Sequence, residues 1–287
     1  MQHFRDILDP YSRESFTLYE CKNCEIALIP NAPDNLEKYY DNRSGNTMRE
    51  KPSSFTRFAR ERLFRLEFNP TLKKFEVDDQ ILDIGCGDGS LIDFLSHKFK
   101  NVSGADLYDK SNWKGSSPYQ QLKTPDSMPD ENFCKNVRLI IMRHVFEHVP
   151  NPQDYLQRLY QLGIQDVVVV VPNRNSIFSK IFGPYWYYWD PPRHLTHFSK
   201  KSLSRIGSQV GYSSTSSITH GIDEVFVSLH TFLLIKNHFR LAKVFKPTGL
   251  LSSLMSILTY PIGRGVIVHH YSILTEKNDK GVQIVKS

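Results

Sequence analysis

Short apolar runs and amphipathic stretches alternate through the middle of the chain. Four apolar runs predict buried strands, at residues 80–85, 101–107, 137–142 and 166–172. Between them, hydrophobic side chains recur at the spacing of one helix face, at Leu91, Ile92, Leu95 and Phe99 and again over residues 152–162. Because strands that alternate with helices form βαβ units, we expect an α/β fold around a parallel sheet.

The N-terminal part lacks a clear strand pattern. Residues 1–50 are rich in turn-forming residues, and we expect them to be irregular. Residues 53–68 place hydrophobic side chains three and four residues apart, so we predict an amphipathic helix that ends at Pro70. We therefore divide the chain into an irregular and helical cap over residues 1–70 and an α/β domain over residues 71–287.

The C-terminal part combines a helix, two strands and an insertion. Ser199 can cap a helix that ends at Gly211, and final strands are predicted at 212–219 and 266–275, the last one antiparallel to the sheet. Residues 220–263 lie between them and are predicted to form a helical insertion. Three roles stay open for this insertion: a lid, a homodimer surface, or a helix in contact with a membrane surface.

Composition and charge narrow the class of protein. The 287 residues are 40% hydrophobic, and the longest aliphatic run is far shorter than the ~18 residues of a membrane-spanning helix. The N-terminus lacks the apolar segment of a signal peptide, so we expect a cytoplasmic protein, with the insertion as its one candidate membrane contact. The net charge of +6 comes from scattered basic residues, which argues against a nucleic-acid partner.

The cysteines point away from disulfides and metal sites. Four cysteines at these spacings are too few for a disulfide framework. Cys21 and Cys24 form a CxxC motif, which supplies only half of the four ligands that a structural zinc site needs. No second CxxC or HxxxH pair lies nearby in the sequence, so we expect no bound metal.

A glycine-rich turn carries the strongest chemical signal. The DIGCGDG sequence, residues 83–89, joins the first sheet strand to the next helix, where glycines let the backbone turn tightly and approach a ligand. Asp106 ends the following strand, 21 residues after Gly85. This is the separation expected for a carboxylate that binds the two hydroxyls of a ribose, so we expect a nucleotide-bearing ligand here.

Spacing and charge favour one such ligand. The dinucleotide motif is GxGxxG, whereas this loop reads GxGxG and has Ser90 at the third glycine position. Asp83 and Asp88 would repel a pyrophosphate, but they suit the sulfonium and ammonium groups of S-adenosylmethionine. An NAD-dependent oxidoreductase is the alternative enzyme, and a non-catalytic protein that binds S-adenosylmethionine is the alternative outside enzymes.

These motifs resemble those of the class I S-adenosylmethionine-dependent methyltransferases. DIGCGDG matches their first motif and Asp106 their second, and MRHVFEHVPNP (residues 142–152) resembles the stretch after their fourth strand. The chain is similar to a bacterial subgroup of sugar, polysaccharide and small-molecule methyltransferases that carries a YWxxWDxPRHLxxFS segment, here residues 185–199. The likeness covers roughly residues 20–220 and a final strand. It departs from the pattern at Val137-Arg138, where Phe-Asp is usual, and in a missing first cysteine pair.

The resemblance implies a Rossmann-like fold with S-adenosylmethionine as cofactor and methyl donor. It assigns the cofactor pocket to the glycine loop and the neighbouring strand ends: Asp83, Gly85, Cys86, Gly87, Gly89, Asp106, Leu107 and Arg143. The aromatic segment after the fifth strand is predicted to bind the acceptor, a small molecule or sugar, through Tyr185, Trp186, Trp189, Asp190 and Arg193. The alternative for this segment is a packed cap with an internal Asp190–Arg193 ion pair.

Methyl transfer to a hydroxyl needs a base that takes the hydroxyl proton. The candidate bases are His144, His148, His194 and His197, with Glu147 and Asp190 behind them. His144 follows the fourth strand, at the sheet edge where ligands bind in open α/β folds. Its alternative role is a wall residue that contacts the cofactor through its backbone. If the segment is helical, His144 and His148 share one face, as a catalytic pair or as a hydrogen-bonded helix start. We therefore predict a methyltransferase that acts on a hydroxyl or another nucleophile.

Overall fold

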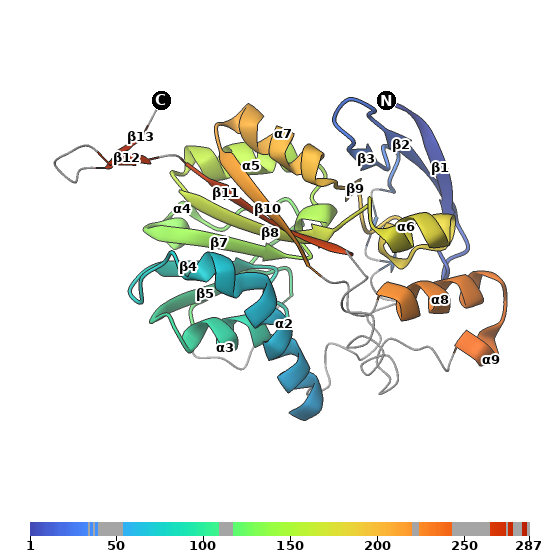
Figure 1. Ribbon diagram of the computed structural model, residues 1–287, viewed down its shortest axis with the longest axis horizontal. Coiled ribbons are helices and arrows are strands. Elements are labelled where there is room, and N and C mark those ends of the chain that lie inside the picture. Colours follow the sequence, from blue (N-terminus) through green and yellow to red (C-terminus); the bar gives the residue numbers. More distant parts are fainter. Residues whose placement is uncertain are drawn as a thin grey trace.

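The computed structural model describes residues 1–33, 35–36, 38–39, 54–108, 117–219, 224–242, 265–273, 275–277 and 283–285. A seven-stranded sheet forms the centre of the molecule (Figure 1). Its strands, in the order in which they lie side by side, are β10 (Ser213–Thr219), β11 (Val266–Ser272), β8 (Asp166–Pro172), β7 (Val137–Arg143), β4 (Gln80–Ile84), β5 (Asn101–Asp106) and β6 (Tyr119–Gln121).

The direction of the strands matches the sequence prediction. β4 pairs parallel with both β5 and β7, β7 pairs parallel with β8, and β6 pairs parallel with β5. β11 is the antiparallel strand, inserted between β8 and β10, with Val268 opposite Val170. The predicted α/β fold with a final antiparallel strand is therefore confirmed.

Helices cover both faces of the sheet (Figure 1). On one face lie α5 (Pro152–Gln161) and α7 (Lys200–Val210), whose apolar side chains join one core cluster with strand residues such as Leu82 and Ile140. On the other face lie α2 (Ser54–Leu72) and α3 (Ser90–Ser96), which join a second cluster with Ile81 and Leu139. Since both faces are covered, the all-apolar run of β8 is fully buried.

The ends of α7 and α2 test the sequence signals that predicted where helices begin and end. Ser199 caps α7 in a capping box with Ser202, and Gly211 ends that helix at a φ of 108°, as predicted. The expected end of α2 at Pro70 is wrong, because the helix continues to Leu72 with the proline inside it. Pro70 costs one hydrogen bond of the last turn, and Phe68 and Leu72 are buried on either side of it.

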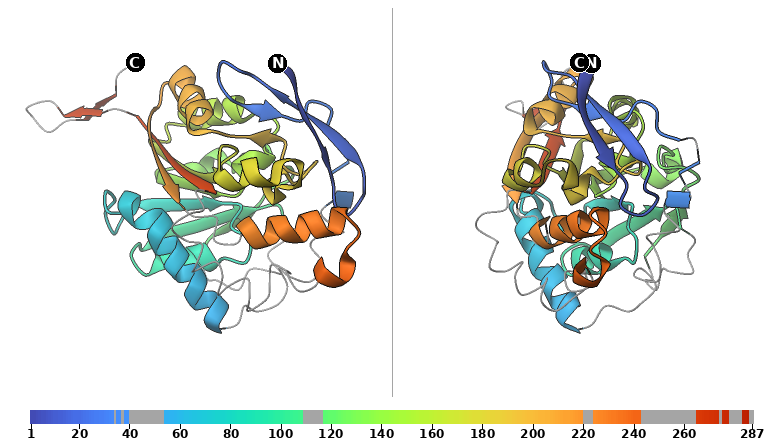
Figure 2. Two further views of the ribbon diagram at one scale, coloured as in Figure 1. Left: turned by 45° about the vertical axis from the view of Figure 1, so that its right-hand side comes forward. Right: turned by 90° about the vertical axis from the view of Figure 1, so that its right-hand side faces the viewer.

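The expectation that residues 1–50 are irregular is wrong for the part that the structure describes. β1 (Gln2–Leu8), β2 (Ser15–Glu20) and β3 (Ala27–Leu28) form an antiparallel sheet, completed by β9 (Thr196–His197) from far along the chain. This N-terminal sheet lies beside the central sheet (Figures 1 and 2). β3 has only two residues, and its partner β9 is distant in sequence. No local sequence pattern therefore predicts this N-terminal sheet.

The described part of the insertion is helical. α8 (Glu224–Ile235) and the short α9 (Phe239–Ala242) follow β10, and residues 220–223 and 243–263 of the insertion lie outside the described residues. α8 lies along α6 (Ile177–Phe182) and the two turns η3 (Gly183–Tyr185) and η4 (Tyr187–Trp189) of the aromatic segment (Figure 2). Within the described residues, no helix combines the length and apolarity needed to cross a membrane.

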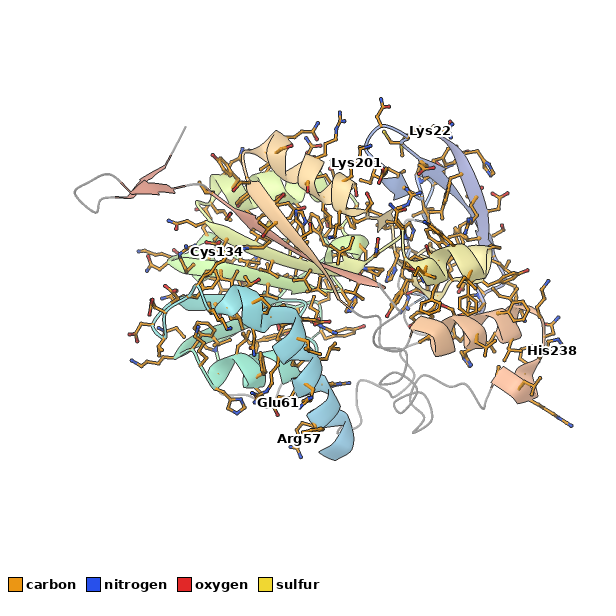
Figure 3. The ribbon with its side chains drawn as sticks, viewed as in Figure 1. Lys22, Arg57, Glu61, Cys134, Lys201 and His238 are labelled. Atoms are coloured by element: carbon orange, nitrogen blue, oxygen red, sulfur yellow. The ribbon has the colours of Figure 1, made fainter. Side chains whose placement is uncertain are left out.

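The smaller elements complete the chain. α4 (Glu131–Cys134) precedes β7, the turn η2 (Phe146–His148) follows it, and β12 (Thr275–Lys277) pairs with β13 (Gln283–Val285) near the C-terminus. Cys134 of α4 packs into the core behind the sheet, whereas Arg57 and Glu61 mark the outward face of α2 (Figure 3). The predicted division at residue 70 stays a prediction, but α2 itself packs directly on the central sheet.

Candidate functional site

The glycine loop, residues 85–89, connects β4 to α3 through left-handed backbone. Gly85, Gly87 and Gly89 have φ values of 77°, 52° and 79°, which only glycine adopts at no steric cost. The amide of Gly85 donates to the carbonyl of Ala105 over 2.7 Å. The amide of Gly87 donates to Asp106 Oδ2, also over 2.7 Å. The loop is therefore fastened to the end of β5, with the Asp106 carboxylate against it.

Two glycines of this loop provide a matched test. A Cβ on Gly85 would lie 2.1 Å from Val145 Cγ2, whereas a Cβ on Gly87 would meet nothing within 4 Å. We expect Gly85→Ala to lower the free energy of unfolding by about 2–4 kcal/mol, because overpacking adds to backbone strain. Gly87→Ala carries the strain alone, about 1–2 kcal/mol. Urea denaturation measures both, and equal losses would contradict this account of Gly85.

Two carboxylates lie beside the loop, Asp83 two residues before it in the chain and Asp106 against the Gly87 amide. Asp83 is 2% exposed, and its Oδ1 atom has no hydrogen-bond partner among the described residues. Burial, with the nearby charge of Asp106, raises the pKa of Asp83 well above its usual value. A buried acceptor without a donor is rare in native proteins. The open space beside Gly87 and the orphaned Oδ1 together fit a ligand that brings hydroxyl and ammonium donors.

The other predicted cofactor residues differ in what they offer. Cys86 is buried in the core, where burial raises the pKa of its thiol, so only its backbone is available to a ligand. Leu107 is half-buried beside Asp106. The Arg143 guanidinium binds Glu67 of α2, with Nε 2.8 Å from Oε2. Arg143 therefore ties α2 to the end of β7.

Sequence reasoning missed the charged partners that α2 supplies. Glu67 pairs with Arg143, and Arg60 pairs with Asp88 of the glycine loop over 2.6 Å. A signal for Glu67 did exist, because this carboxylate lies between Phe64 and Phe68, on the face that the helix buries. A charged residue on the apolar face of a predicted helix implies a buried partner.

The fold gathers three of the predicted catalytic residues and one acid into a compact group, called here the Glu147 cluster: Glu147, His144, His148 and His194. The first three follow β7, and His194 comes from the loop after η4. The rings of His148 and His194 meet edge to face, with centroids 4.8 Å apart. Because η2 begins at Phe146, His144 does not share a helix face with His148, and that expectation is wrong.

The members of the Glu147 cluster differ in exposure. The side chain of His144 is 29% exposed, and its Nδ1 lies 3.4 Å from Glu147 Oε1. Burial lowers the pKa of both His148 and His194 to about 4, so both rings are neutral near pH 7. Glu147 is 1% exposed, and neither of its carboxylate oxygens has a hydrogen-bond partner among the described residues. His144 is thus a partly exposed proton acceptor of the cluster, and His148 is half-buried as well.

The aromatic segment, residues 185–199, packs mainly against the protein itself. Trp186 and Trp189 are 1% and 2% exposed and belong to the core beneath the N-terminal sheet, together with Ile7 and Leu18. Arg193 and Asp190 form an ion pair. Both features match the packed-cap alternative. Tyr185 is half-buried and meets the ring of Phe232 of α8 edge to face.

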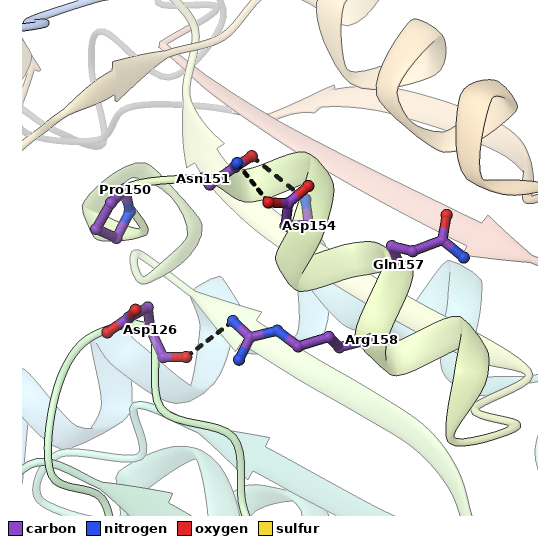
Figure 4. A pocket seen from close by; sticks show the side chains of 6 residues that line it. All are labelled: Asp126, Pro150, Asn151, Asp154, Gln157 and Arg158. Atoms are coloured by element: carbon purple, nitrogen blue, oxygen red, sulfur yellow. Dashed lines mark hydrogen bonds between the residues drawn. The ribbon is translucent and has the colours of Figure 1, made fainter.

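A pocket of about 480 Å³ lies at the start of α5 (Figure 4). Its walls are Asp126, Pro150, Asn151, Asp154, Gln157 and Arg158. Its polar groups largely satisfy one another, because Asn151 caps α5 through Asp154 and Arg158 donates to the carbonyl of Asp126 over 3.0 Å. No residue of the glycine loop or of the Glu147 cluster lines it, so it is separate from the candidate site.

Comparison with known proteins identifies the family. Residues 55–217, more than half of the chain, match the family model described as a methyltransferase domain. No curated protein matches the chain. A cyclopropane-fatty-acyl-phospholipid synthase-like protein from Lactobacillus casei shares the fold, with a TM-score of 0.50 and 13% identity over 77% of this chain and 94% of that one. A SAM-dependent methyltransferase from Archaeoglobus fulgidus aligns at a TM-score of 0.46 and 15% identity, covering 76% of this chain and 97% of that one. The chain therefore belongs to the methyltransferase-domain family, and the expectation of a class I, S-adenosylmethionine-dependent methyltransferase is confirmed.

Proposed function

We propose that the protein transfers the methyl group of S-adenosylmethionine to a hydroxyl of a small molecule or sugar precursor. The observation that carries the cofactor site is the hydrogen bond from the Gly87 amide to Asp106, with the orphaned Oδ1 of Asp83 on the adjacent strand. In this site Asp106 accepts from the ribose hydroxyls. Asp83 faces the ammonium end of the ligand, where a positive charge offsets its burial.

S-adenosylmethionine supplies a methyl group that its sulfonium has already activated, so the chain mainly has to position the acceptor and remove a proton. His144 stands next to Val145, the residue that contacts Gly85 of the glycine loop. We therefore propose His144 as the general base for the acceptor hydroxyl. The buried positions of Trp186 and Trp189 support a framework role for them, and the half-buried Tyr185 is the better candidate for acceptor contact.

The contacts of α8 favour the lid among the three roles considered for the insertion. Ser228 accepts a hydrogen bond from the amide of Tyr187 over 3.2 Å, and Arg13, in the turn between β1 and β2, donates to the carbonyls of Leu234 and Ile235. α8 thus covers the aromatic segment and fastens it to the N-terminal sheet. We propose that it forms the outer wall of the acceptor site.

Titration calorimetry tests the cofactor site. We expect the protein to bind S-adenosylmethionine and not NAD. Asp106→Ala should weaken that binding by about 1–3 kcal/mol, or roughly 5- to 150-fold, because ribose hydroxyls lose their acceptor. The control is Asp78→Ala, which removes an exposed carboxylate paired with Lys100 and should leave the affinity unchanged. Binding of NAD in place of S-adenosylmethionine would overturn the assignment.

A further inference from the structure

Glu147 is a buried carboxylate that the protein itself does not satisfy. Its side chain is 1% exposed, and within the described part of the chain neither oxygen has a hydrogen-bond partner. A buried charge without donors is costly, so such groups are normally paired or bound to a metal. The nearest nitrogens are His144 Nδ1 at 3.4 Å and His194 Nε2 at 4.0 Å, both measured from Oε1.

His194, which is buried, and His148, which is half-buried, are held in the orientation of metal ligands. Nδ1 of His148 lies 2.8 Å from the carbonyl oxygen of Arg193, and Nδ1 of His194 lies 2.9 Å from that of Tyr188. A carbonyl oxygen only accepts, so both Nδ1 atoms donate, and in each neutral ring the lone pair sits on Nε2. A ring nitrogen fixed by a backbone carbonyl is the usual outer contact of a metal-binding histidine.

We propose that Glu147, His148 and His194 bind one divalent transition-metal ion of the zinc class. One ligand atom from each residue lies within 4.8 Å of the others. Two imidazoles and one carboxylate form a ligand set of catalytic zinc sites, which keep a further position open. Ligand atoms around a tetrahedral zinc ion are about 3.3–3.6 Å apart, so binding requires the three ligand atoms to move closer together, by up to about 1.2–1.5 Å. Sequence spacing does not predict this ion, since His194 is 46 residues from His148.

Other charges around the cluster are compatible with a cation. Asp190 Oδ2 lies 3.6 Å from His194 Nε2 and adds a second carboxylate, whose charge Arg193 partly offsets. His144 Nδ1 approaches the same Oε1 atom of Glu147 as His194 Nε2 does. The open coordination position would take an oxygen of the acceptor and lower the pKa of its hydroxyl. This role rests on the proposed function, whereas metal binding itself does not.

Metal titration of the chelator-treated full-length protein tests the site. We expect one Zn²⁺ to bind per chain by calorimetry and to raise the melting temperature. Glu147→Gln and His194→Gln should each weaken Zn²⁺ binding by more than the roughly 10- to 100-fold typical of an outer partner. His197→Gln is the matched control, because His197 is also buried and its ring lies 6.3 Å from that of His194, outside the ligand set. Cys21→Ser excludes the CxxC motif as the binding site.

Glu147→Gln keeps the shape of the side chain and distinguishes a metal ligand from a carboxylate with a purely structural role. Without metal, Glu147→Gln should melt at the wild-type temperature or above it, because it removes an unsatisfied buried charge. A metal-free melting temperature that falls in this variant, together with no Zn²⁺ uptake by the wild type, would overturn the proposal. Loss of the bound zinc in Cys21→Ser would overturn it too.

Two further measurements keep the proposals distinguishable. Co²⁺ bound to the wild type should show visible absorption without a thiolate charge-transfer band. This measurement uses no variant, so it does not depend on whether a variant folds. S-adenosylmethionine titrated into metal-free protein tests the cofactor site alone. Binding of this cofactor without Zn²⁺ uptake would contradict only the metal site, and Zn²⁺ uptake without cofactor binding would contradict only the proposed function.

Discussion

Trp186→Ala should destabilise the protein by about 3–5 kcal/mol, the range for truncating a large aromatic side chain in a core. Its indole is 1% exposed and packs edge to face on Trp189 and Tyr188, with ring centroids 4.9 and 5.5 Å away. The cavity left behind lies between the aromatic segment and the N-terminal sheet. Urea denaturation of the wild type and the variant measures the loss.

The control for this prediction is Tyr185→Ala, one residue earlier in the same turn. Tyr185 is half-buried and contacts Phe232 of α8, so its truncation should cost clearly less stability. Both variants should bind S-adenosylmethionine with near-native affinity when they are assayed below their melting temperatures, because the proposed cofactor contacts come from the ends of β4 and β5. If Trp186→Ala kept its stability and instead weakened acceptor binding, Trp186 would be a stacking surface after all.

The central sheet was predictable because its signals are local. The apolar run of β8, Val167–Val171, is covered on both faces and therefore shows no alternation. Ser199 and Gly211 mark the ends of α7 by capping and left-handed geometry, which depend on nearby residues. The N-terminal sheet was not predictable in this way. β3 has two residues, and Ala27 and Leu28 pair with His197 and Thr196, about 170 residues away.

The candidate site also combines residues that local sequence signals predict with residues that only the tertiary fold brings together. The glycine loop and Asp106 were recognised because one turn and one strand end carry them. The role of the aromatic segment was open in sequence, because a ring-rich loop suits both a binding surface and a core. The indoles of this segment, Trp186 and Trp189, are buried because the N-terminal sheet packs on them. Likewise, the proximity of Glu147 to His194 depends on how the loop after η4 folds back on β7.

His144→Gly should lower kcat by about 10²–10⁴, the usual effect of removing a general base. His144 has a φ of 55°, so glycine fits the backbone without strain and leaves space for a small molecule. The amide of His144 donates to the carbonyl of Val170 over 2.8 Å, and glycine keeps this bond. The assay uses labelled methyl transfer from S-adenosylmethionine to an acceptor found by screening hydroxylated small molecules and nucleotide sugars.

Added imidazole distinguishes a base from a wall residue at this position. If the His144 ring takes the hydroxyl proton, imidazole should restore part of kcat in His144→Gly, while the affinity for S-adenosylmethionine stays near the wild-type value. A wall residue would give loss of cofactor affinity and no rescue. An unchanged kcat would contradict the assignment, because the hydroxyl would then lose its proton without this ring. His97→Gly is the control for histidine loss alone, since His97 lies exposed after α3, outside the Glu147 cluster.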